Sequence, residues 1–279
     1  MKYRELYQKG VETLKQAGIP EAELDARLLL EHICQTDRNV LLVHGDREIE
    51  EEQSGHYLEA IQIRKKRIPL QHITGKTEFM GLEFVVSQNV LIPRQDTEIL
   101  VETALKHLHD GMKILDMCCG SGCILLSLLH YSNDCLGVGV DLSDEALQIA
   151  KENAKRLSLE AEWIRSDLYT ELDATKKFDL LVSNPPYIRT SEIENLMPEV
   201  KEYEPYMALD GREDGLFFYR ELLKGAPAYL NRGAVVLFEI GCDQGVDVSD
   251  LMKRMNMIEV QIIKDYAGLD RVVSGVFLE

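Results

Sequence analysis

Apolar residues recur at helical spacing through the first part of the chain. Hydrophobic positions three or four residues apart predict four consecutive helices, over residues 3–14, 20–33, 37–45 and 50–67. Gly18 and Pro69 follow the ends of two of these segments, and Pro20 opens the second. Residues 1–75 are therefore expected to form a small helical domain, with Asp37 capping its third helix.

Shorter apolar segments follow this region. Gly81 separates two of them, at 77–80 and 82–86, which predicts a β-hairpin within a linker over residues 76–90. From residue 91 to residue 279, apolar strands alternate with helical segments, which is typical of an α/β domain with a parallel sheet. We expect helices at 96–109, 124–129, 217–230 and 246–255, and strands at 112–116, 135–140, 162–165, 178–183, 234–240, 259–264 and 272–278, the last two forming an antiparallel edge.

The composition suits one sizeable α/β domain and one small domain. The chain has 279 residues, of which 45% are hydrophobic. No apolar run approaches the length of a membrane span and the N-terminus has no signal-peptide core, so we expect a cytoplasmic protein. The six cysteines show no paired metal-ligand spacing, and reduced thiols without a metal site are expected.

Negative charge is concentrated in the second part of the chain. Residues 1–75 hold 11 Lys and Arg against 13 Asp and Glu, whereas residues 76–279 hold 20 against 35, so −15 of the net charge of −17 falls there. Affinity for nucleic acid comes largely from basic surface, so direct nucleic-acid binding is not expected and a basic protein substrate fits better. The cluster at residues 64–67 is interpreted as a solvated basic helix end, with a docking role as the alternative.

The tetrapeptide Asn184-Pro185-Pro186-Tyr187 follows directly after the strand predicted at 178–183. Two consecutive prolines cannot donate ladder hydrogen bonds, and they disfavour helix in the preceding residue, so the strand must end in a stiff turn. The carboxamide oxygen of Asn184 and the carbonyl of Pro185 can then accept both hydrogens of a substrate NH2 group. An ordinary proline-terminated strand end is the alternative.

A turn of small residues upstream predicts a nucleoside site. The strand predicted at 112–116 leads through residues 117–123 into an apolar helix. Glycines in this turn allow a ligand to approach the backbone. Asp141 ends the next strand, 21 residues after Gly120, where a carboxylate can accept hydrogen bonds from both hydroxyls of a ribose.

The details of this turn favour S-adenosylmethionine over a nicotinamide dinucleotide. The dinucleotide fingerprint requires Gly or Ala at its third position, where this chain has Leu125. Asp116 would place negative charge near the amino group of a methionine moiety and its sulfonium. Asp167 and Leu168 would provide a polar and an apolar contact beside an adenine. Helix capping is the alternative for both Asp116 and Asp167.

These motifs, in this order, resemble the class I S-adenosylmethionine-dependent methyltransferases. The Asn-Pro-Pro-Tyr tetrapeptide is similar to that of the amino-methylating branch, which includes adenine-N6 and cytosine-N4 DNA enzymes and protein glutamine methyltransferases. The segments 89–102, 199–209 and 210–216 resemble the peptide chain release factor glutamine methyltransferases, the PrmC/HemK family. The resemblance covers essentially the whole chain. It implies a Rossmann-like sheet with an antiparallel edge strand, and a helical substrate-recognition domain joined to it by the hairpin.

The resemblance also implies roles for the matching residues. The implied cofactor-binding residues are Asp116, Cys118, Cys119, Gly120, Ser121, Gly122, Asp141, Asp167, Leu168 and Asn184. The implied substrate-binding residues are Arg94, Asn184, Pro185, Pro186 and Tyr187, and of these Asn184, Pro185 and Tyr187 are expected to act in catalysis. A salt bridge from Arg94 to Asp96 or Glu98, and burial of Tyr187 in the core, are the alternatives. Many relatives have glycine in place of Cys118, whose backbone must therefore adopt a geometry that its Cβ permits.

The implied reaction transfers a methyl group from S-adenosylmethionine to the side-chain amide nitrogen (N5) of the glutamine in the Gly-Gly-Gln motif of release factors, and leaves S-adenosylhomocysteine. Positioning of this weak nucleophile by Asn184 and Pro185 is expected to supply most of the catalysis, without a general base. Glu239 either borders the substrate pocket or caps a strand end. A monomer is expected.

Three other functions are alternatives to this one. A glutamine of a ribosomal protein is an alternative substrate. A DNA or RNA base amino-methyltransferase would need a basic groove and a target-recognition segment, and the sequence shows neither. A binding module without enzymatic activity would leave the amide-holding turn without a role.

Overall fold

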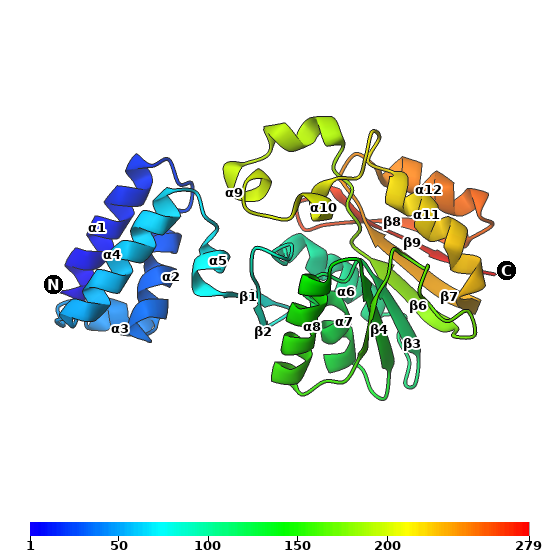
Figure 1. Cartoon of the computed structure of the whole chain (residues 1–279), viewed down its shortest axis with the longest axis horizontal. Helices are drawn as coiled ribbons and strands as arrows, with labels where there is room; N and C mark the ends of the chain where they lie inside the picture. The colour runs from blue at the N-terminus through cyan, green and yellow to red at the C-terminus, as the bar shows by residue number, and fades with distance from the viewer. Residues whose placement is uncertain (279) are drawn as a thin grey trace. The chain divides into compact units, whose positions relative to one another are not determined.

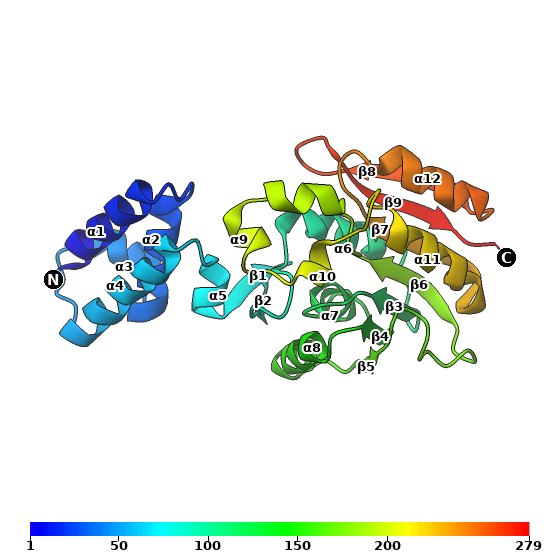
Figure 2. The same ribbon diagram turned by 45° about the horizontal axis from the view of Figure 1, so that its top comes forward.

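The computed structural model describes residues 1–278 of the chain. It divides into two compact units, one formed by residues 1–76 with 197–203, and the other by residues 77–196 with the chain from 204 onward. Figures 1 and 2 show the elements of both units. The chain therefore leaves the second unit for seven residues and then returns to it, which the sequence did not predict.

The first unit is helical and has a core of its own. Its helices are α1 (Tyr3–Gln16), α2 (Ala22–Cys34), α3 (Arg38–Val43), α4 (Glu51–Lys65), α5 (Leu70–Thr74) and α9 (Pro198–Lys201). The four predicted helices are confirmed, and Asp37 caps α3 by accepting hydrogen bonds from the backbone N–H groups of Asn39 and Val40, at 2.7 and 2.9 Å. The largest buried side chains of this core are those of Leu6, Leu14, Leu29, Leu30, Tyr57 and Ile61.

Arg64 is buried in this unit, so the prediction that the whole basic cluster at 64–67 is solvated was wrong. Its side chain lies between two carboxylates, with Nε 2.7 Å from Oδ2 of Asp25 and Nη2 3.2 Å from Oε1 of Glu199. Burial raises the pKa of Asp25, and the Arg64 guanidinium opposes that rise. The Tyr203 hydroxyl also donates to the carbonyl of Lys66, at 2.9 Å. These contacts hold residues 197–203 against the N-terminal helices.

A seven-stranded sheet forms the centre of the second unit. In spatial order its strands are β5 (Glu162–Arg165), β4 (Leu136–Asp141), β3 (Lys113–Met117), β6 (Phe178–Ser183), β7 (Leu230–Glu239), β9 (Asp270–Val276) and β8 (Ile258–Lys264). The strands from β5 to β7 are parallel, whereas β9 is antiparallel to both β7 and β8. The predicted α/β sheet with an antiparallel edge is confirmed. The strand order reverses between β3 and β6, where doubly wound sheets bind ligands.

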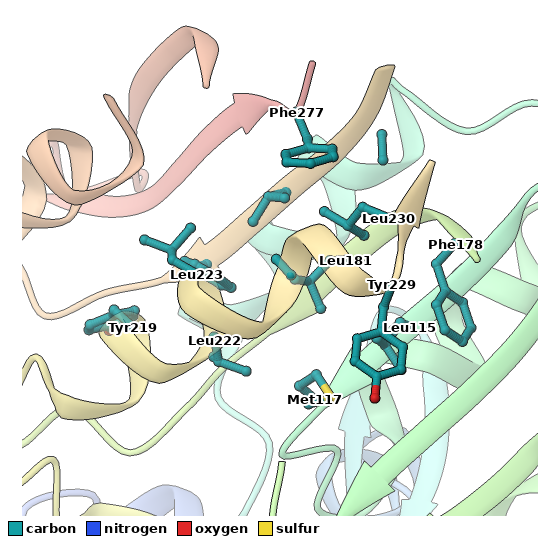
Figure 3. Close-up of a cluster of buried hydrophobic side chains, with 14 of the residues drawn as sticks. Leu115, Met117, Phe178, Leu181, Tyr219, Leu222, Leu223, Tyr229, Leu230 and Phe277 are labelled. Carbon is teal, nitrogen blue, oxygen red and sulfur yellow. The ribbon is translucent and has the colours of Figure 1, made fainter. Parts of the chain in front are cut away.

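Helices cover both faces of this sheet. They are α6 (Glu98–Leu105), α7 (Cys123–His130), α8 (Asp144–Leu157), α11 (Phe217–Gly225) and α12 (Gly245–Arg254). Because neighbouring side chains of a strand point to opposite faces, Leu115 packs into one core with α11 and α12, whereas Ile114 packs into the other with α6 and α7. Figure 3 shows the first core, in which Leu222 and Leu223 of α11 lie near Leu181 of β6. Within the described residues, no helix has both the length and the apolar character needed to cross a bilayer.

The predicted hairpin is present as β1 (Lys76–Phe79) and β2 (Leu82–Val85). Asn153 of α8 is fully buried and holds β2: its Oδ1 accepts from the N–H of Val85 at 2.7 Å, and its Nδ2 donates to the Val85 carbonyl at 3.0 Å. The helix predicted at 217–230 is shorter than expected, because α11 ends at Gly225 and β7 begins at Leu230. The remaining short elements are η1 (Gln95–Thr97), η2 (Thr190–Asn195), α10 (Tyr206–Leu209) and η3 (Ala226–Ala228).

Candidate active site

The carboxyl ends of β3, β4, β5 and β6 open into one pocket of about 250 Å³, at the point where the strand order reverses. Of the residues predicted for the site, those that line this pocket are Arg94, Cys118, Cys119, Gly120, Ser121, Asp141, Asp167, Leu168, Asn184 and Pro186. The predicted site residues that do not line it are Asp116, Gly122, Pro185 and Tyr187. The topology thus brings together turns that are far apart in the sequence.

The turn between β3 and α7 contains three residues in the left-handed region of backbone space. These are Cys118 (φ 60°), Gly120 (φ 53°) and Gly122 (φ 76°). A Cβ added at Gly122 would lie 2.8 Å from the Trp163 ring and 3.1 Å from Ala150 Cβ, so this glycine permits close packing of the turn. A Cβ at Gly120 would meet no atom within 4 Å, so there the backbone stays open to a ligand.

Asp141, at the end of β4, is bonded to the same turn. Its Oδ2 accepts a hydrogen bond from the N–H of Gly120 at 2.8 Å, and its Oδ1 accepts from the N–H of Ser143 at 2.9 Å. Burial raises the pKa of Asp141, and these backbone hydrogen bonds oppose the rise. Each carboxylate oxygen keeps a further lone pair, so Asp141 can still accept from two hydroxyl groups.

The other two acidic candidates, Asp116 and Asp167, have different surroundings. Asp116 is fully buried and accepts a hydrogen bond from the N–H of Leu125, in the first turn of α7, at 3.3 Å. This geometry is that of a helix cap, the alternative reading of this residue, and burial raises its pKa well above the ordinary value. Asp167 is exposed and lines the pocket together with Leu168.

Asn184 and Pro186 line the pocket, whereas Pro185 and Tyr187 are not among its lining residues. Pro185 is buried, and the Tyr187 side chain packs against the core that α11 and α12 cover. For Tyr187 this matches the alternative of burial in the core. The stiff turn therefore presents its asparagine to the pocket, while its tyrosine is partly buried against the core.

Gln244, which sequence reasoning missed, ties this turn to a loop at the pocket rim. The side chain is 2% exposed, and its Nε2 donates to the carbonyls of Tyr187 and Gly215 at 3.0 and 3.2 Å. Its Oε1 accepts from the N–H of Gly241 at 2.9 Å. A Cβ added at Gly211 would lie 2.7 Å from the Tyr187 backbone, so the loop also requires glycine there. No motif around Gln244 signals this role.

Thr97 lines the pocket beside Asn184, and Glu239 ends the strand next to the one that Asn184 follows. The Asn184 Nδ2 donates to the Thr97 hydroxyl at 3.4 Å, and both Thr97 (3% exposed) and Glu239 (2% exposed) are buried. Burial raises the pKa of Glu239 to about 7, while hydrogen bonds from the side chains of Thr97 and Tyr187 oppose the rise. Glu239 does not line the pocket. Thr97 belongs to the segment 89–102 that carried the family resemblance, but nothing in the sequence linked it to Asn184.

Arg94 lines the pocket and forms an ion pair that the sequence did not predict. Its Nη2 lies 2.6 and 2.7 Å from the two carboxylate oxygens of Glu204, whose side chain is 1% exposed. The expected partners are engaged elsewhere: Asp96 pairs with Arg271 at 3.2 Å, and Glu98 accepts from the N–H of Met80 at 2.6 Å. Burial raises the pKa of Glu204, and the Arg94 guanidinium opposes the rise.

The sheet and the pocket define a methyltransferase fold. A methyltransferase from Pyrococcus furiosus superimposes with a TM-score of 0.54 at 16% identity, over 80% of this chain and 98% of that one. The T. thermophilus 16S rRNA N2 G1207 methyltransferase, solved with AdoMet and guanosine, superimposes with a TM-score of 0.53 at 17% identity, over 72% of this chain and 49% of that one. At these identities the likeness concerns the fold.

Sequence relatives define the family. The PrmC N-terminal domain model matches residues 5–75, and the methyltransferase small domain model matches residues 84–200. Release factor glutamine methyltransferases from Clostridium botulinum and Clostridium acetobutylicum are 42% and 40% identical to the chain, over 98% and 99% of both partners respectively. The chain belongs to the release factor glutamine methyltransferase family, which confirms the resemblance seen in the motifs.

Proposed function

We propose that this protein transfers a methyl group from S-adenosylmethionine to the side-chain amide nitrogen (N5) of the glutamine in the Gly-Gly-Gln motif of peptide chain release factors. The observation that carries the proposal is that Asn184 shares one pocket with the turn 118–122 and with Asp141. The pocket thus offers both an acceptor for an NH2 group and the contacts that a nucleoside needs. The relatives that match the full chain carry this activity in their names.

The residues of the pocket suit S-adenosylmethionine. Gly120 leaves backbone open to a ligand, Asp141 offers acceptors for ribose hydroxyls, and Leu168 offers an apolar surface for an adenine. S-adenosylmethionine supplies an activated methyl group on a sulfonium when it is bound. Asp141 suits that positive charge, because its carboxylate lies close enough to Cys118 to raise the pKa of the thiol.

Positioning is the proposed catalytic contribution of the chain. An amide nitrogen is a weak nucleophile, since its lone pair is delocalised into the carbonyl. Asn184 Oδ1 and the Pro185 carbonyl are the proposed acceptors that hold the substrate NH2 group in one orientation. Tyr187 is proposed to contribute through its partly buried side chain, which packs against the core at the end of the turn. Arg94, already paired with Glu204, is proposed to border the entry of the substrate loop.

Labelled methyl transfer tests this function. Purified release factor, a ribosomal protein preparation and duplex DNA are compared as acceptors for methyl groups from labelled cofactor. We expect label at the glutamine of the Gly-Gly-Gln motif and none in DNA. Transfer to DNA or to the ribosomal protein alone would overturn the proposal.

The variant Asn184→Ala tests the residue that carries the proposal. Loss of an oriented acceptor is expected to lower kcat on the order of 10²- to 10³-fold, with the cofactor dissociation constant changed by no more than about twofold. Asn133→Ala is the matched control, because Asn133 is exposed on a loop that does not line the pocket. Near-normal turnover of Asn184→Ala would remove Asn184 from its proposed role.

A further inference from the structure

We infer that Arg94 and Arg212 bind the main chain of the substrate loop, by donating hydrogen bonds to the carbonyl oxygens of the glycines that precede the target glutamine. The inference rests on the proposed function, because it names a second part of the substrate that the same pocket recognises. Among the described residues that line the pocket, these two are the only basic ones. Arg212 was not among the residues predicted for the site.

One segment of the chain, residues 204–212, supplies the counter-ions of both arginines. Arg94 Nη2 donates to the two carboxylate oxygens of Glu204, at 2.6 and 2.7 Å. Arg212 Nη1 donates to Oδ2 of Asp210 at 3.2 Å. Both carboxylates are buried, whereas the two arginine side chains are 40% and 62% exposed. Each buried carboxylate thus holds an arginine whose side chain stays accessible to a ligand.

The end of the Arg212 side chain is held by two groups. The first is the Asp210 carboxylate, whose Oδ1 accepts from the hydroxyl of Thr190 at 2.6 Å and from the N–H of Arg212 itself at 2.9 Å. The second is the ring of Phe217, because the Arg212 guanidinium carbon lies 5.9 Å from its centroid, within the range of a cation–π interaction. These contacts give an exposed side chain a defined position.

Backbone hydrogen bonds join Arg212 to the turn that is proposed to hold the substrate amide. The N–H of Gly211 donates to the carbonyl of Ile188 at 2.8 Å, and the N–H of Thr190 donates to the carbonyl of Arg212 at 3.0 Å. The tetrapeptide 184–187 comes immediately before these residues of the turn. An arginine fixed here can therefore reach the part of the substrate that adjoins the glutamine.

The backbone of Arg212 is strained. Its φ of 71° lies in the left-handed region, where a residue with a Cβ has an unfavourable conformation and glycine does not. Strain of this kind persists where the surrounding structure imposes it, and it is concentrated at sites that bind ligands. A glycine at this position would avoid the strain but would offer no side chain. The strain is accounted for if the guanidinium has a ligand to bind.

The donors that remain on the two arginines suit a neutral acceptor. A guanidinium has five N–H donors, and among the described residues only Nη2 of Arg94 and Nη1 of Arg212 have acceptors. Because a carboxylate already balances each positive charge, a phosphate ligand would gain less Coulomb energy here than at an unpaired arginine. A carbonyl oxygen requires only the donors.

The Gly-Gly-Gln motif presents such acceptors. Glycine has no side chain, so its main-chain groups are the only polar groups by which the two glycines can be recognised. The other acceptor that the pocket would hold is the carboxylate of the methionine moiety of S-adenosylmethionine. Arg212 is bonded to the turn after Asn184 and not to the turn 118–122, which favours the substrate.

Binding measurements distinguish these two acceptors without turnover. Isothermal titration calorimetry gives the dissociation constant of S-adenosylhomocysteine, and then that of release factor for the enzyme saturated with S-adenosylhomocysteine. In Arg212→Met, which removes every donor of the side chain, release factor should bind about tenfold more weakly and S-adenosylhomocysteine within about twofold of wild type. Arg94→Met is combined with Glu204→Gln, so that no buried carboxylate loses its partner, and should have the same effect.

Two further variants serve as controls for charge and for folding. Arg254→Met removes an exposed arginine of α12 that does not line the pocket, and both dissociation constants should stay within about twofold. Arg212→Gly relieves the left-handed strain, so its midpoint of thermal unfolding should equal or exceed that of wild type while release factor binds about tenfold more weakly. A purely structural arginine would not separate stability from substrate affinity in this way.

Steady-state kinetics completes the test. In Arg212→Met, kcat/KM for release factor should fall about tenfold with kcat within about twofold of wild type, because the methyl-transfer step uses Asn184. Wild-type affinity for release factor in Arg212→Met or in the Arg94 double variant would overturn this inference alone. A loss confined to S-adenosylhomocysteine affinity would also overturn it, by assigning the arginines to the cofactor carboxylate. A wild type that transfers no methyl group to release factor would overturn the proposed function and this inference with it.

Discussion

Cys118 occupies a backbone conformation that favours glycine, with φ of 60°. A Cβ in the left-handed region costs on the order of 1 kcal/mol, and this cost falls on a residue of the proposed cofactor pocket. The thiol itself is neutral at physiological pH, because burial raises its pKa. Its influence is therefore expected to be conformational.

The variants Cys118→Gly and Cys118→Ala separate the effect of the Cβ on stability from the effect of the thiol. Glycine removes the Cβ and should raise the free energy of unfolding by up to about 1 kcal/mol, offset in part by the greater entropy of the unfolded chain. Alanine keeps the Cβ and should change stability less, while Cys118→Val should lower it by more than 1 kcal/mol. Urea denaturation measures the free energy of unfolding of each variant and so checks this order of stabilities. A valine variant as stable as the glycine variant would contradict the account.

Single residues differ in how well the sequence predicts them. Asn184, Gly120 and Asp141 stand in motifs whose spacing carries the chemistry, and the structure places all three at one pocket. The partners that orient the site lack such a signal, because they meet only after folding. Thr97 is 87 residues from Asn184, and Gln244 is 57 residues from Tyr187.

At the level of elements, the buried strands were the most predictable parts of the fold. β6 begins and ends at the residues expected from the sequence, because a strand covered on both faces appears as a short, almost continuous apolar run. β5 also has the expected bounds, although it is an edge strand whose side chains are exposed or half-buried. The single-turn helices α5, α9 and α10 are too short to show a helical period. The helix α8 was not predicted from the sequence, although Ser143 caps it by accepting a hydrogen bond from the N–H of Ala146 at 3.1 Å.

The variant Gln244→Ala should destabilise both the turn that ends at Tyr187 and the loop that contains Gly215. It leaves the carbonyls of Tyr187 and Gly215 without their side-chain donor, so we expect a loss of about 2 to 3 kcal/mol in the free energy of unfolding. Amide hydrogen exchange should rise in residues 205–216 and around residue 187. Gln148→Ala, an exposed change on α8, is the control. Unchanged exchange in that loop would show that Gln244 does not hold it.

At the level of the whole molecule, charge is the property that bears on function. The chain carries a net charge of −17, of which −15 falls in residues 76–279. Long-range attraction between opposite charges raises association rates and weakens as salt screens it. A basic surface on the protein substrate would therefore be drawn to this acidic part of the chain.

Salt should accordingly slow the association of the protein substrate with the enzyme and leave the methyl-transfer step unchanged. Between 50 and 300 mM NaCl we expect kcat/KM for release factor to fall on the order of 3- to 10-fold, with kcat at saturating substrate nearly constant. Steady-state kinetics at several salt concentrations measures both. A kcat/KM that is independent of salt would argue against electrostatic capture.

The path of the chain between the two units has a consequence for any attempt to separate them. Because residues 197–203 belong with the N-terminal helices, the backbone crosses from one unit to the other at residues 76/77, 196/197 and 203/204. A gene fragment that starts at residue 77 would encode Glu199 without Arg64, its buried counter-ion. Seven residues from the middle of the catalytic sequence thus complete the helical unit, and deleting residues 1–76 would leave that segment without the helices against which it packs.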